Sequence, residues 1–165
     1  MAKDNSFDIV SEYDVSAMIN ACEQAQREIS TRYDFSGTNS KLVFDRDAKK
    51  IDIESNSELK IDAIVGVLES KLLKANLSLK FLDKSEEILE NNMIVRKTIP
   101  LVQGLDQTKA KQITALIREK DWKVKTQIQG EAVRVSSAKK DDLQAVMEAL
   151  RSSKFDFPIG FNNFR

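Results

Sequence analysis

The stretch IDIESNSELKIDAIVGVL, residues 51–68, is matched 82 positions later by VRVSSAKKDDLQAVMEAL, residues 133–150. In both stretches aliphatic residues alternate with polar ones, and apolar residues then recur at steps of three and four. This is the pattern of a strand followed by an amphipathic helix. Seven pairs correspond at this one offset without a gap: Ile51 and Val133, Ile53 and Val135, Ser55 and Ser137, Ile61 and Leu143, Ala63 and Ala145, Val65 and Met147, Leu68 and Leu150.

Around this strand and helix, each half of the chain shows the order strand, helix, strand, strand, helix, strand. In the first half the expected elements are a strand at Phe7–Ile9, a helix from Val15 to Tyr33, strands at Leu42–Phe44 and Ile51–Ile53, a helix from Ile61 to Leu72 and a strand at Leu77–Phe81. After a polar connection at 83–92, the second half gives a strand at Met93–Val102, a helix around Ile113–Ile117, strands at Val124–Gln129 and Ala132–Ser136, a helix around Leu143–Leu150 and a strand at Pro158–Phe164. The pattern predicts an α+β fold, a tandem of two ferredoxin-like βαββαβ sandwiches.

The first helices correspond at a different offset, 98, which pairs Val15 with Ile113. This offset predicts an insertion in the first half of about four helical turns, or an equivalent loop. The stretch RYDFSGTN, residues 32–39, lies in that insertion.

RYDFSGTN has two interpretations. As a helix exit, it uses Gly37 for a positive φ, and Tyr33 and Phe35 close the ends of the core. As a ligand loop, it offers the guanidinium of Arg32 and the hydroxyl of Ser36 to a phosphate and a purine.

The composition favours a binding protein over an enzyme. The 165 residues are 41% hydrophobic, which suffices for a packed core, and they include no histidine. The commonest general base and zinc ligand are therefore missing, and we expect no catalytic residue, metal or cofactor. We expect a cytoplasmic protein without a membrane span or signal peptide. The single cysteine, Cys22, lies in an apolar helical stripe and is expected to be buried.

The charges are distributed unevenly along the sequence. Residues 1–92 contain 12 Lys+Arg and 18 Asp+Glu, whereas residues 93–165 contain 14 and 8. The positive half either meets phosphates or attracts the negative half within the monomer.

One face of each predicted sheet is left uncovered by helices. In RNA-recognition modules of this topology, aromatic residues of the third strand stack on bases there. Neither half has that motif, because the outward positions are Asp52 and Glu54 in the first half and Arg134 and Ser136 in the second. Any nucleic-acid face should therefore belong to the second half, with Lys125, Gln127 and Arg134 as its polar residues.

Three side chains of this half have alternative interpretations. Arg134 either contacts a ligand phosphate or pairs with an acidic side chain of the first half. Phe161 and Phe164 should lie on opposite faces of the last strand, so at most one of them can be exposed. Each either packs in a core or at the domain interface, or stacks on a base.

The chain resembles the YajQ family of bacterial proteins over essentially its whole length. The resemblance rests on four stretches: SFDIVSEYD at 6–14, RYDFSGT at 32–38, VKTQIQGEAVRVSSAKKDDLQAVMEALR at 124–151 and FNNFR at 161–165. It implies two ferredoxin-like domains that exchange their N-terminal strands, one comprising residues 13–103 with a strand near 93–102, the other residues 1–12 with 104–165. It also implies nucleotide binding, proposed nucleic-acid binding and, in some members, sensing of cyclic di-GMP with regulation of transcription. It supplies no catalytic residues.

We therefore expect a non-enzymatic protein that binds a nucleotide (ATP, GTP or cyclic di-GMP) or RNA. The alternative is an adaptor that binds a protein, such as a transcription regulator, through an exposed sheet face or edge. An enzyme is disfavoured because the chain lacks the G-x-x-x-x-G-K-[ST] phosphate loop. The candidate ligand contacts are Arg32, Ser36, Lys125, Gln127, Arg134, Phe164 and Arg165.

Overall fold

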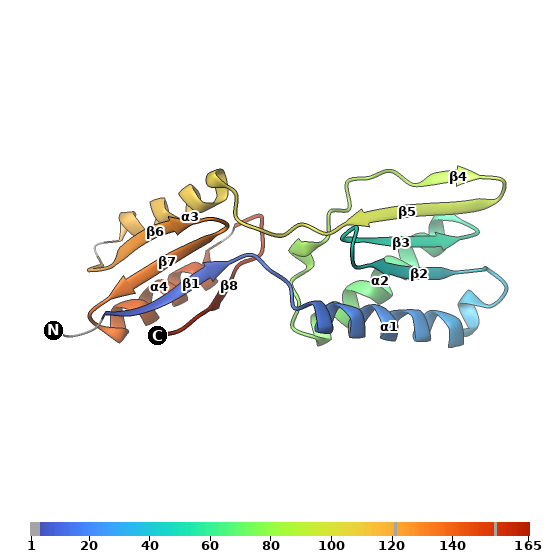
Figure 1. Cartoon of the computed structure of the whole chain (residues 1–165). Coiled ribbons are helices and arrows are strands. Elements are labelled where there is room, and N and C mark those ends of the chain that lie inside the picture. Colours follow the sequence, from blue (N-terminus) through green and yellow to red (C-terminus); the bar gives the residue numbers. More distant parts are fainter. Residues whose placement is uncertain (1–3, 121, 154) are drawn as a thin grey trace. The chain divides into compact units, whose positions relative to one another are not determined.

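The structure is a computed structural model that describes residues 4–120, 122–153 and 155–165. The chain divides into two compact units (Figure 1). One unit, Tyr13–Val102, is a single segment and is called the continuous unit. The other combines Met1–Glu12 with Gln103–Arg165 and is called the discontinuous unit.

The continuous unit packs two helices on one face of a four-stranded antiparallel sheet (Figure 1). Its elements are α1 (Val15–Thr31), β2 (Lys41–Asp45), β3 (Lys50–Ser55), α2 (Glu58–Lys74), β4 (Leu89–Asn91) and β5 (Ile94–Pro100), with short 3-10 helices at Tyr33–Phe35 and Leu79–Phe81. The strand order is β2-β3-β5-β4.

The discontinuous unit repeats this arrangement. Its elements are β1 (Asn5–Val10), α3 (Gln107–Glu119), β6 (Lys125–Gln129), β7 (Ala132–Ser137), α4 (Lys140–Ser152) and β8 (Gly160–Asn162), and the strand order is β6-β7-β1-β8. Within the described residues, no helix is both long and apolar enough to cross a membrane.

The two sheets have the same topology when β1 and β5 are each counted as the first strand of their unit. Both then follow the order second, third, first, fourth, which is the ferredoxin-like order. The predicted α+β fold of two ferredoxin-like sandwiches is therefore confirmed. β1 precedes the continuous unit but pairs with β7 and β8, and β5 pairs with β3 and β4, which is the strand exchange that the family resemblance implies.

The segments that connect the two units meet inside the discontinuous unit. The backbone N–H of Gly104 donates a hydrogen bond to the carbonyl oxygen of Ser11, at 2.6 Å. Gly104 has φ +91°, and a Cβ at this position would lie 3.1 Å from the carboxylate of Glu131. Both the backbone conformation and the close approach therefore favour glycine here.

Local sequence explains most of these elements. The carboxylates of Asp14 and Asp106 and the hydroxyl of Ser57 each accept a backbone N–H from the first turn of the helix that follows. In the third strand of each unit, β3 and β7, burial alternates residue by residue, so that one face enters the core and the other remains open. The seven sequence pairs thus fall on the third strand and second helix of both units.

The expected strand at Leu77–Phe81 is wrong. Leu77 and Phe81 are buried, but they belong to a turn and the 3-10 helix that follows it. At the start of this 3-10 helix, the Ser78 hydroxyl accepts a hydrogen bond from the Lys80 N–H. The fourth strand is instead β4, which lies in the segment 83–92 expected to be a polar connection. It pairs with β5 across a tight turn, in which Asn92 and Met93 have φ of 51° and 68°. Positive φ at both central residues is typical of the two-residue turns that join the strands of a hairpin.

The insertion in the first half is shorter than the offset of 98 indicates. α1 begins 26 residues before β2, and α3 begins 18 residues before β6, so the difference is eight residues. The offset of 98 aligned the two first helices incorrectly. Apolar residues of an amphipathic helix recur every three or four positions, so the apolar patterns of two helices still agree when one is shifted by one or two turns.

The strand exchange also changes the distribution of charge. Residues 13–102 contain 13 Lys+Arg and 15 Asp+Glu, and the remaining residues contain 13 and 11. The two units therefore carry formal charges of −2 and +2, much smaller than the −6 and +6 of the two sequence halves.

Candidate functional site

Four of the seven predicted contacts lie together on the open face of the discontinuous unit, the sheet face opposite α3 and α4. The strand register arranges this face in two neighbouring rows. The first, here called the outer row, consists of Lys125, Ser136, Ser6 and Arg165; the second, the inner row, consists of Gln127, Arg134, Asp8 and Asn162. The inner row crosses four strands, whereas the outer row crosses three strands and the C-terminal residue that bonds to Ser6; each row is about 14 Å wide.

Asp8 is the centre of a hydrogen-bond network in the inner row. Its side chain is only 10% exposed, and its Oδ1 accepts a hydrogen bond from Arg134 Nε at 3.1 Å. Its Oδ2 accepts one from Asn163 Nδ2 at 2.8 Å. Burial alone would raise the pKa of Asp8, but the hydrogen bonds from Asn163 and Arg134, aided by the charge of Arg165, hold this pKa below its ordinary value.

Arg134 forms an ion pair with an acidic residue of the first half of the sequence, which is one of its two interpretations. The carboxylate belongs to β1, which is a strand of the same sheet, and not to the rest of the first half. Arg134 bonds to Asp8 through Nε, which leaves the orientation of the guanidinium fixed while its terminal Nη atoms make no hydrogen bond to a described residue. The ion pair therefore positions Arg134 and does not consume all of its donors.

Phe164 does not lie on the open face. Its ring stacks on Phe7 at 6.1 Å, and Phe7 is fully buried in the core and also contacts Phe161. The expectation that Phe161 and Phe164 lie on opposite faces is therefore wrong. Asp8 opposes Asn162 whereas Ser6 bonds to Arg165, so one residue of β1, Phe7, faces two residues, Asn163 and Phe164, and Asn163 has a φ of 53°. This is a β-bulge, which shifts the alternation by one residue.

The continuous unit has an equivalent row with a different charge. Its members are Lys41, Glu54, Arg96 and Leu89, and Arg96 Nε lies 2.8 Å from Glu54 Oε1. Where that row has an ion pair at its centre, the outer row of the discontinuous unit has two serines between two cations. Among the open-face strand positions of β1, β6, β7 and β8, the only carboxylate is Asp8, which is already bonded.

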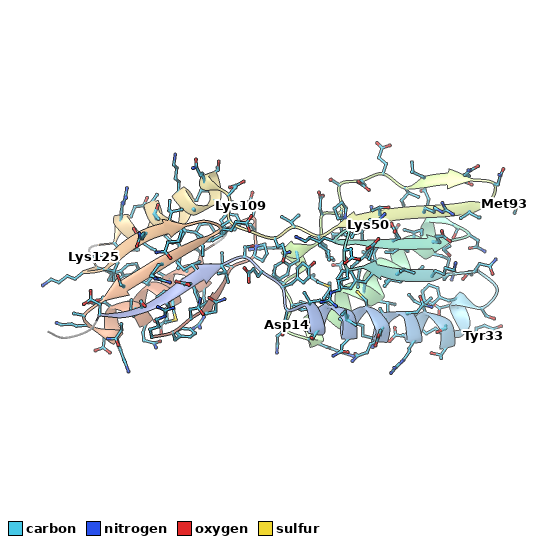
Figure 2. All side chains as sticks on the ribbon, in the orientation of Figure 1. Asp14, Tyr33, Lys50, Met93, Lys109 and Lys125 are labelled. Atoms are coloured by element: carbon cyan, nitrogen blue, oxygen red, sulfur yellow. The ribbon has the colours of Figure 1, made fainter. Side chains whose placement is uncertain are left out.

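A cavity of about 430 Å³ lies at the Lys125 end of the outer row. Lys123, Lys125 and Ser136 are among the residues that line it, together with the carboxylate-bearing Asp4. Lys125 is exposed at the start of β6 (Figure 2). This end of the face combines ammonium groups with hydroxyls, which are the side chains that phosphate oxygens accept hydrogen bonds from.

The remaining candidates, Arg32 and Ser36, belong to the continuous unit and are not part of the open face. Arg32 donates to both carboxylate oxygens of Asp34, through Nε at 3.0 Å and Nη2 at 2.8 Å, and also to Glu28 at 3.2 Å. The hydrogen bonds from Arg32 hold the pKa of Asp34 below its ordinary value. The charge of Arg32 is thus compensated locally, whereas the Ser36 side chain is exposed.

RYDFSGTN forms the exit of α1. Phe35 is buried at 4% exposure and lies within 5.1 Å of the Arg32 guanidinium and 5.4 Å of the Lys60 ammonium. Gly37 has the positive φ that was expected, 73°. Tyr33, however, is 94% exposed and does not close the core, because the 3-10 turn rotates it off the apolar stripe of α1 (Figure 2).

Sequence reasoning missed four members of the site, Ser6, Asp8, Asn162 and Asn163. The positions of Ser6 and Asp8 could have been predicted, because these residues alternate with Phe7 and Ile9 and the implied exchange brings this strand into the second sheet. The bulge at Asn163 has only a weak signal, an asparagine, which tolerates a positive φ. In the described part of the chain, no group of three or more thiol or carboxylate side chains could hold a metal ion.

The fold and the open face define the class of protein: paired ferredoxin-like sandwiches with exchanged first strands and one cationic, hydroxyl-bearing sheet face. The family model described as "Nucleotide-binding protein YajQ-like" matches residues 5–165, and the chain belongs to this family.

Relatives match over the full length. One named "Nucleotide-binding protein" from Trichodesmium erythraeum is 43% identical over 165 residues, which is 100% of both chains. Another of that name from Carboxydothermus hydrogenoformans is 44% identical, again over 100% of both chains. A third from Desulforamulus reducens is 39% identical over 100% of this chain and 99% of its own.

Proposed function

We propose that this protein binds a nucleotide, without catalysing its conversion, through phosphate contacts on the open face of the discontinuous unit. The observation that carries the proposal is the outer row, in which Lys125 and Arg165 flank Ser136 and Ser6 without a carboxylate. The names of the relatives support the ligand class.

The geometry fits a ligand with more than one phosphate or an RNA backbone. The outer row spans about 14 Å, and Lys125 and Arg134 are diagonal neighbours whose Cα atoms are about 7–8 Å apart. Two phosphates of a dinucleotide or of a nucleoside triphosphate can therefore meet two different cations. Without stacking aromatics on the face, we expect phosphate contacts to dominate and binding to weaken as salt rises.

Calorimetric titration with ATP, GTP, cyclic di-GMP and a short single-stranded RNA tests the proposal. We expect at least one of them to bind more tightly than about 100 μM, and Lys125→Glu to weaken that binding by about tenfold or more. Lys41→Glu is the matched control, because Lys41 occupies the corresponding position at the start of β2, and it should leave the affinity unchanged. If no ligand binds at that level, or if both variants weaken binding equally, the proposal is refuted.

A further inference from the structure

A groove in the continuous unit lies outside the open face and plays no part in the proposed function. It runs between α1 and the outer edge of β2 and has a volume of about 570 Å³. Its walls are mostly apolar, with Ile19 and Cys22 from α1 and Leu42 and Phe44 from β2. Apolar clefts of this size are typical of binding sites.

The floor of the groove includes the outer edge of β2. β2 is the first strand in the order β2-β3-β5-β4, so one side of it pairs with no strand of the described residues. The N–H of Leu42 donates to Gln26 Oε1 at 2.7 Å and therefore points away from β3. Because the direction repeats every second residue in an antiparallel ladder, the N–H and C=O of Phe44 also point into the groove. A further strand could pair with them.

Two arginines line opposite ends of the groove. α1 and β2 run antiparallel (Figure 1), and Gln26 contacts Leu42, so its neighbour Arg27 lies at the Leu42 end while Arg46 lies at the other. Four strand residues separate these ends, which corresponds to about 13 Å. Within the described ranges, neither guanidinium has a carboxylate within 4.0 Å. Glu23 lines the groove on α1 between them.

We propose that this groove binds an extended peptide segment of a partner protein, which adds to β2 as a fifth strand. Side chains at alternate positions of a strand share one face, so those at i, i+2 and i+4 face α1 together. The distance of about 13 Å between the two ends of the groove equals the distance between residues i and i+4 of a strand. The peptide therefore carries acidic residues at i and i+4 for Arg27 and Arg46, and an apolar residue at i+2 for Ile19, Cys22 and Phe44. Glu23 disfavours an acid at the centre.

An NMR titration of the full-length, ¹⁵N-labelled protein with the capped peptide KTETVTETK tests this proposal. We expect saturable shifts of the amides of Leu42, Val43 and Phe44, with a dissociation constant below about 1 mM. Arg27→Glu and Arg46→Glu should each weaken binding about fivefold or more, because attraction is replaced by repulsion. The peptide KTKTVTKTK, in which lysines replace both glutamates, should bind to the parent protein at least about fivefold more weakly than KTETVTETK does.

Two control variants separate this proposal from unspecific effects and from the proposed function. Arg118→Glu changes an exposed arginine of α3 and should leave the peptide affinity unchanged, as should Lys125→Glu. Thermal melts establish that Arg27→Glu and Arg46→Glu are folded. The proposal is overturned if the peptide does not saturate these amides, if the two arginine variants bind it as the parent does, or if a nucleotide alone saturates the same amides.

Discussion

The Asp8–Arg134 pair gives a prediction whose size follows from its burial. Arg134→Ala leaves the Asp8 carboxylate, 10% exposed, with a single hydrogen bond from Asn163. A poorly hydrated charge that loses one charge-assisted bond costs about 2 kcal/mol of unfolding free energy. The full penalty of a buried pair does not apply, because the Arg134 side chain is 31% exposed and water can reach the site.

Asp8→Ala should cost less, about 1 kcal/mol, because the partly exposed guanidinium of Arg134 can turn to water. The double variant should cost about 2 kcal/mol, so that the coupling energy of the pair is about 1 kcal/mol. Urea denaturation of the parent, both single variants and the double variant measures this energy. The cycle of Glu54 and Arg96 is the control, because Arg96 is 63% exposed and its coupling should be under about 0.5 kcal/mol. A coupling for Asp8 and Arg134 no larger than in the control would refute the reasoning.

Three further predictions concern the fold, the pH dependence and the cysteine. Residues 13–102 expressed alone should melt cooperatively and show native near-UV dichroism. Residues 13–92 should do neither, because this fragment lacks β5 at the centre of the sheet. Equal behaviour of the two fragments would contradict the topology. The pKa of Asp8 is lower in the folded than in the unfolded state, so the ionised carboxylate contributes its full stabilisation above about pH 4, and this contribution is lost as the pH falls through the folded-state pKa. The difference in unfolding free energy between the parent and Asp8→Asn should therefore shrink in acid. A difference that stays constant with pH would exclude a stabilising role of the Asp8 charge. Burial raises the pKa of Cys22 to about 12, so iodoacetamide at about pH 8 should alkylate it only after denaturation, as mass spectrometry can show; rapid alkylation of the folded protein would contradict this.

The fold was predictable where the apolar periodicity of a segment matched its burial against the core. The alternation at Ile51–Ile53 and Val133–Val135 and the stripes of the helices that follow specify which side faces the core, and these elements lie where the sequence places them. Prediction failed where burial did not require a strand. Leu77 and Phe81 are buried by a turn and a 3-10 helix, whereas β4 has three exposed residues and therefore carries no apolar alternation at all.

The candidate site was predictable in part, for a related reason. Lys125, Gln127 and Arg134 share a face because strand alternation is local. The partner of Arg134 is 126 positions away in sequence, and only the exchanged strand brings Asp8 to it. Phe164 was misplaced because a single extra residue at the bulge reverses the alternation, and periodicity contains no information about where such a residue is inserted.

The hydrogen bond between Gly104 and Ser11 has a consequence for the order of folding. It joins two residues of one unit that are separated by the whole continuous unit, a loop of 92 residues. Closing a flexible loop of that length costs of the order of 4 kcal/mol in chain entropy. The cost falls to that of a short tether once Tyr13–Val102 has folded and its two ends are held. We therefore expect β1 to dock on β7 and β8 as a late, slow event, which makes the first strand of the chain among the last to acquire its native partners.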